Sequence, residues 1–133
     1  MAAAPTVLPH IDAVTTALTA AQLTVYLGGA PQGVAPPYAV LYPSPGAPVR
    51  ASLADDRVNW QSVLQITCVG ATAEQTLNYM DRTRAALDAP LVVAGRTGWR
   101  PEALDGQPVT RDDDVTPPVY YAVARWRLRS TPS

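Results

Sequence analysis

The sequence predicts an α+β domain in which two helices pack on one face of a mainly antiparallel sheet, with long proline-rich loops between the elements. Residues 60–70 alternate between apolar and polar side chains, as half-buried strands do. Residues 73–87 follow directly and carry apolar side chains at helical intervals. The remaining segments are ordered as helix, strands, helix and strands, which is typical of this fold class.

The N-terminal third predicts one helix and two short strands. Residues 9–21 begin with a proline, which suits the first turn of a helix, and they carry one narrow apolar stripe. Residues 23–27 and 38–42 are rich in strand formers, and a loop with two adjacent glycines and three prolines separates them. The stripe of the helix consists of Ile11, Val14, Leu18 and Ala21.

Residues 43–58 are predicted to form a long loop or arm. The segment contains three prolines and shows neither a helical nor a strand period. Segments of this length without regular structure are usually functional or disordered in compact domains. We therefore expect an extended arm that rearranges on assembly.

The centre of the chain predicts the core. Gly70 ends the strand, and Thr72 and Gln75 have the spacing of a capping box that starts a helix. A strand that runs straight into an amphipathic helix implies that the helix folds back over the apolar face of the sheet. We expect Leu64 and Ile66 of the strand to be buried against Leu77, Met80 and Leu87 of the helix.

The region after the second helix is rich in loops. Pro90 ends that helix, and residues 91–94 predict a short strand. Residues 95–118 are polar, with further strands predicted around Trp99 and Val109.

Composition limits the protein to a few classes. A chain of 133 residues fits one domain, taken as residues 1–133. Charged residues make up only 16%, which favours self-association, and the net charge of −1 gives no overall basic field for nucleic acid or anionic membrane. One cysteine excludes an intrachain disulfide, and no apolar run is long enough to span a membrane.

Residues that could perform chemistry are few. Cys68 lies mid-strand on the apolar face, where a thiol is expected to be inert, and His10 is expected to be a solvated first-turn residue. A Cys–His pair or a serine triad would need that single histidine. Asp55–Asp56 and Asp112–Asp114 could bind a hard cation, but consecutive aspartates lack the alternating spacing of a calcium loop. We predict no catalytic, cofactor-binding or metal-ligating residue.

The last strand, predicted over residues 119–129, places three arginines in line on one face, with three aspartates before it across a short proline turn. The arginines either form a solvated face that discourages aggregation or contact the acids of another subunit or DNA phosphates. We expect all six residues to face a neighbouring subunit or a ring lumen. The six residues are Arg125, Arg127, Arg129, Asp112, Asp113 and Asp114.

Residues 130–133, at the end of the chain, are expected to be frayed.

Several segments together resemble a known family. They are the run 38–42, the strand ending near Gly70, the helix ending at residues 82–87, and the closing stretch 111–121 that leads into residues 125–128. In the order of its elements and in the residues of these segments, the chain resembles the tail terminator, or tail-completion, proteins of long-tailed actinobacterial phages.

This resemblance implies a structural virion protein without catalytic residues or cofactors. Members form a ring, commonly a hexamer, that caps the finished tail tube and presents a surface to the head connector. The implied partners are other copies of the chain, the tail tube protein, the connector protein and DNA passing through the lumen. Assembly would take place in the bacterial cytoplasm. A connector stopper, a tube subunit, and a small cytoplasmic enzyme or ligand-binding domain remain as alternatives.

Overall fold

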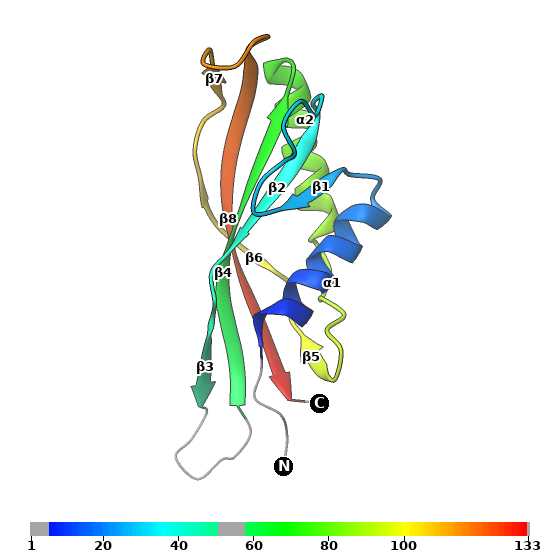
Figure 1. Cartoon of the computed structure of the whole chain (residues 1–133). Helices are drawn as coiled ribbons and strands as arrows, with labels where there is room; N and C mark the ends of the chain where they lie inside the picture. Colours follow the sequence, from blue (N-terminus) through cyan, green and yellow to red (C-terminus); the bar gives the residue numbers. More distant parts are fainter. Residues whose placement is uncertain (1–5, 51–57, 133) are drawn as a thin grey trace.

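The computed structural model describes residues 6–50 and 58–132, and within these residues it contains two helices and eight strands (Figure 1). In chain order they are α1 (Val7–Ala20), β1 (Val25–Leu27), β2 (Tyr38–Pro43), β3 (Ala47–Arg50), β4 (Val58–Gly70), α2 (Ala73–Ala86), β5 (Arg96–Gly98), β6 (Glu102–Gly106), β7 (Thr110–Asp112) and β8 (Val119–Pro132).

The ladder between β4 and β8 organises the sheet. The two strands pair antiparallel from Trp60, opposite Ser130, to Gly70, opposite Tyr120. At ~3.3 Å per residue this ladder is about 33 Å long. β2 and β3 pair with the other edge of β4, while β7, β6 and β5 pair in turn with the other edge of β8. β1 pairs parallel with β2 and extends the sheet.

Alternation along β4 and β8 gives the sheet two different faces. Figure 1 shows both helices on the same face, which we call the inner face; the opposite one is the outer face. The predicted α+β fold, with two helices on one face of a mainly antiparallel sheet, is therefore confirmed. The core on the inner face includes Val14 and Leu18 of α1, Tyr79 and Leu87 from the α2 region, and Leu41, Leu64, Ile66 and Leu128 of the sheet.

The helix α2 starts where the sequence predicts it. The Thr72 hydroxyl accepts a hydrogen bond from the backbone N–H of Gln75 at 3.1 Å. The Gln75 side chain accepts one from the N–H of Ala71 at 2.7 Å. The first bond satisfies one N–H that the helix start leaves unpaired, so the predicted N-cap at Thr72 is confirmed. The return bond from Gln75 goes to Ala71, one residue before the N-cap, where a capping box would bond the N–H of Thr72 itself.

The buried face of α2 agrees with the prediction at Leu87, which is in the core, and in part at Met80, which packs against it, but differs at Leu77. Leu77 is 52% exposed and Met80 is only partly buried, whereas Thr76 and Tyr79 are buried. The reason lies at the end of β4, where a Cβ on Gly70 would come within 2.6 Å of the Thr76 hydroxyl oxygen. Thr76 can occupy this tight contact because its hydroxyl lies 3.0 Å from the carbonyl of Thr72, which accepts its proton.

The predicted loop at residues 43–58 contains a strand. β3 pairs with the first residues of β4, and Gly46, at φ +78°, precedes it. A Cβ on Gly46 would overlap the indole of Trp60, so the turn packs directly on that ring. Residues 51–57 of the predicted arm lie outside the described residues.

Two further expectations after α2 are wrong. Residues 91–94 form no strand, although Leu91 and Val93 are buried. The strand begins at Arg96 instead, after a turn in which the Arg96 N–H donates to the Val93 carbonyl. Residues 130–132 are not frayed, because β8 continues to Pro132 and Ser130 is 1% exposed. Ser133 lies outside the described residues.

Replacing Ile66 by alanine should lower the free energy of unfolding by about 2–5 kcal/mol, because the side chain is fully buried. The matched control is Leu77→Ala, which truncates a half-exposed side chain and should change stability by less than about 0.5 kcal/mol. Denaturant unfolding measures both variants. Similar losses for the two would show that α2 is rotated relative to the packing described here.

Candidate interaction surface

The predicted row of arginines lies on the outer face of β8. Arg125, Arg127 and Arg129 stand opposite Gln65, Val63 and Gln61 of β4, whose side chains also point away from the helices. The three arginine side chains are between 35% and 49% exposed. The alternation predicted from the sequence is confirmed. We call these three residues the arginine row.

Acidic residues of β6 pair with the arginine row. Arg125 donates from Nε to Asp105 Oδ1 at 2.6 Å and from Nη2 to Oδ2 at 2.9 Å, a bidentate geometry. This contact lowers the pKa of the Asp105 carboxyl and raises the pKa of Arg125. Both groups are exposed to water, so the pair adds little to stability.

The other two arginines share a single carboxylate. Glu102 Oε2 lies 3.3 Å from Arg127 Nη1 and 3.4 Å from Arg129 Nη2. Two positive groups therefore meet one negative group at this end of the outer face. Trp99 lies beside them, because its N–H donates to the Arg129 carbonyl at 3.0 Å, and its side chain is 51% exposed. We call Trp99, Glu102, Arg127 and Arg129 the Trp–Arg surface.

The three aspartates lie at the opposite end of β8, far from the Trp–Arg surface. Asp112 pairs with Val119 at the start of the strand, eight residues before Arg127, or about 26 Å along it. Asp113 instead forms an ion pair with Arg111 at 2.6 Å. The N–H of Asp114 donates to Asp112 Oδ1 at 3.0 Å. The structure therefore does not bring these aspartates and the arginine row together within one chain.

A groove of about 900 Å³ opens on the outer face beside these aspartates. Residues 30–36 and 115–119 form its walls, and Tyr38, Thr67 and Val69 lie on its floor. We call it the proline–tyrosine groove, because both walls carry prolines and Tyr38 and Tyr121 line it. Sequence reasoning missed it, since its two walls are about 80 residues apart in the chain. The prolines before β2 and before β8 were the available signal.

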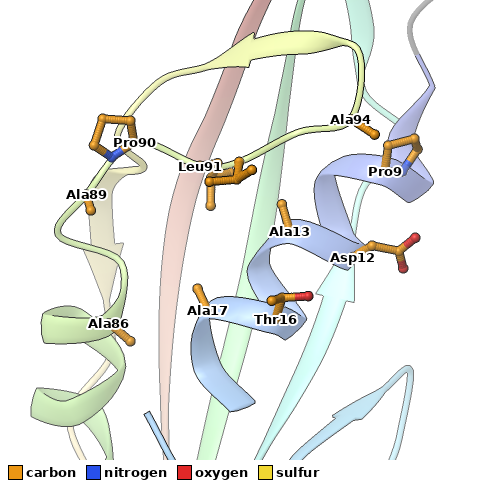
Figure 2. Close-up of a pocket in the computed structure, with 11 residues that line it drawn as sticks. Pro9, Asp12, Ala13, Thr16, Ala17, Ala86, Ala89, Pro90, Leu91 and Ala94 are labelled. Carbon is orange, nitrogen blue, oxygen red and sulfur yellow. The ribbon is translucent and has the colours of Figure 1, made fainter. Parts of the chain in front are cut away.

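A smaller hollow of about 420 Å³ lies on the helix side of the molecule, between α1 and residues 86–94 (Figure 2). Small side chains line most of it, among them Ala13, Ala17 and Ala86, and Asp12 is its one charged group. This lining is mostly apolar, and Asp12 and Thr16 are the side chains with polar groups in it.

Cys68 lies in the core, as predicted. It is fully buried, and burial raises the pKa of its thiol to about 11. The hydrogen bond with Thr83 lowers this pKa, but its effect is smaller than that of burial. The thiol sulfur lies 3.7 Å from the Thr83 hydroxyl oxygen. A thiol with this pKa carries almost no thiolate at neutral pH and is a poor nucleophile.

The expectation of a solvated His10 is wrong. Its side chain is 0% exposed, and its ring stacks on Trp60 with centroids 3.7 Å apart. Nδ1 lies 2.7 Å from the Thr6 carbonyl, and Nε2 lies 2.7 Å from the Ser130 hydroxyl. Local partners for both nitrogens let a polar ring occupy the core.

The surrounding donors determine the protonation state of His10. The Thr6 carbonyl can only accept, so Nδ1 carries the proton. Arg96 Nε donates to Ser130 Oγ at 2.7 Å, so the Ser130 hydroxyl proton is available for donation to His10 Nε2. Burial lowers the pKa of His10 below its ordinary value, which together with these partners favours the neutral ring. The cluster joins the first turn of α1 to β5, β4 and β8 and has a structural role.

Two further findings concern the described part of the chain. Residues 6–50 and 58–132 contain no group of three or more His, Cys, Asp or Glu side chains that could hold a metal ion. No helix in these ranges has the length and apolar character needed to cross a membrane.

The fold is shared with a chain of a solved structure described as the virion of a native gene transfer agent (GTA) particle. The TM-score is 0.65 at 18% sequence identity, and the match covers 93% of this chain and 94% of that one. At this identity the likeness establishes a common fold. No protein-family model and no curated protein matches the sequence.

Burial of His10 should make stability depend on pH. Desolvation is the main cause that lowers its pKa below 6.5; the Thr6 carbonyl opposes it, and the nearby Arg96 lowers the pKa further. Below pH 6.5 the unfolded chain then binds more protons than the folded one. The free energy of unfolding should therefore fall as pH drops from about 6.5, by at most about 1.4 kcal/mol per unit.

Denaturant unfolding between about pH 5 and pH 7 measures this effect, because carboxylates titrate mainly below that range. His10→Gln is the control: its stability is expected to be lower throughout but flat across the interval. A wild-type curve as flat as that of the variant would contradict the neutral, buried His10.

Proposed function

We propose that this chain is a structural virion protein whose copies form a ring, commonly six-membered in the family it resembles. The ring would terminate a phage tail tube and join it to the head connector. The observation that carries the proposal is the fold shared with a chain of a gene transfer agent virion over nearly the full length of both chains. The finer role, tail termination, rests on the sequence resemblance to tail terminator proteins.

The distribution of chemical groups supports a role in assembly rather than catalysis. Nucleophilic catalysis would need Cys68 and His10, and both are buried on the inner face. His10 stacks on Trp60, which lies eight residues from Cys68 along β4, or about 26 Å. The outer face, in contrast, offers a wide groove, exposed aromatic rings and charged side chains, which are features of protein contact surfaces.

The partners follow from the proposed position in the particle. One side of the ring would contact the tail tube protein and the other the head–tail connector, and DNA would pass through the lumen. No metal or cofactor is required. A connector stopper or a tail tube subunit is the alternative function, because the structural match names a whole virion and not a position within it.

Gold-labelled antibody against this protein should bind phage particles at the head–tail joint in negative-stain electron micrographs. This expectation follows from a ring located once per particle, between tail tube and connector. The control is antibody against the tube protein, which should label the full length of the tail.

Labelling distributed along the tail would contradict the terminator role and favour the tube subunit. Particles that carry no label, although the antibody recognises the protein in the same lysate, would contradict a virion role altogether.

A further inference from the structure

The outer face carries two exposed surfaces of opposite character at its two ends. Beside the Gly70 end of β4 lies the proline–tyrosine groove, whose lining includes Asp112. Asp113 and Asp114 follow Asp112 directly in the chain, and Asp113 forms an ion pair with Arg111. At the other end lies the Trp–Arg surface, where two arginines share Glu102. The segment beside the first surface carries three aspartates and one arginine, and the second surface carries two arginines and one glutamate.

The groove itself is suited to an apolar side chain. Its floor consists of Thr67 and Val69 with Tyr38, and prolines line both walls. Asp112 is the one carboxylate in its lining, and its side chain accepts a hydrogen bond from the Asp114 N–H. A flat, uncharged ring flanked by positive charge would therefore fit its interior and its rim at once.

The Trp–Arg surface has this composition. The Trp99 indole is half exposed, and it stands next to Arg129 across the β5–β8 pairing. Arg127 lies on the same face, two residues away along β8. Tryptophan and arginine are the residues that most often contribute the main binding energy at protein interfaces.

One molecule cannot bring its own two surfaces together. Val69, on the groove floor, and Gln61, which stands opposite Arg129, are eight residues apart on one continuous strand, so about 26 Å separates them. Both surfaces are built on the same rigid ladder. Contact between them therefore requires two molecules.

We propose that the proline–tyrosine groove is the docking site for the Trp–Arg surface of a second copy of this chain. In this contact Trp99 enters the groove while Arg127 and Arg129 approach Asp113 and Asp114 on its rim. The contact joins two different patches, so each copy keeps one free groove and one free Trp–Arg surface, and successive copies add head to tail until a ring closes. This inference deepens the proposed ring function and rests on it.

The test measures self-association of the purified full chain by sedimentation and native mass spectrometry. Trp99→Ala and Arg127→Glu should each raise the dissociation constant by at least about tenfold, because each removes a central anchor of the contact. Circular dichroism and the thermal midpoint should stay close to wild type, since Trp99 is half exposed and the Arg127 side chain, 35% exposed, pairs with Glu102 at the surface. Leu77→Ala and Arg84→Glu are the matched controls on the helix side and should assemble normally.

Charge exchange tests the pairing itself. Asp114→Arg should impair assembly as Arg127→Glu does, whereas the chain that carries both substitutions should assemble again. Equimolar mixing of the two single variants should also restore assembly, because each then offers the charge that the other lacks. Added salt should weaken the wild-type association.

Three results would overturn the inference: Trp99→Ala and Arg127→Glu assembling like wild type, no rescue by the double substitution, or a wild-type chain that stays monomeric at every concentration. These failures are distinguishable from failure of the proposed function. Gold labelling at the head–tail joint would leave the virion role intact even where self-docking through this groove is refuted.

Discussion

The antiparallel pairing of β4 with β8 is the interaction on which the rest of this structure depends. Every other strand except β1 pairs with one of these two, and β1 is attached through β2. Because side chains alternate along both strands, the same ladder places Ile66 in the core and Arg127 on the outer face. A shift of register by one residue would exchange the two faces, so the buried core and the candidate interaction surface are determined together.

The elements that depend on alternation could be predicted from the sequence. The strand around Ile66, the last strand and the line of arginines all follow from a period of two, and the N-cap at Thr72 is a local pattern. The buried face of α2 and the position of His10 could not be predicted from hydrophobicity. Both depend on polar groups that find hydrogen-bond partners inside the fold.

The candidate surface depends on contacts between distant segments, and these have no signature in one sequence. The partners of the arginine row come from β6, whose pairing with β8 is irregular between Ala103 and Gly106, so no simple alternation pairs Asp105 with Arg125. The aspartates closest in sequence to the row lie at the far end of the same strand. The length of β8 therefore keeps these aspartates and the arginine row apart within one molecule, although they are close in the chain.

Head-to-tail docking of the Trp–Arg surface into the proline–tyrosine groove connects this architecture with the proposed ring. The most direct test is a cryo-electron microscopy map of the wild-type assembly. We expect a closed ring in which the groove of each copy holds the Trp99 side chain of its neighbour, with Asp113 and Asp114 near the neighbour's arginines. A map in which the grooves face open solvent, or in which copies meet through their helix faces, would contradict this account.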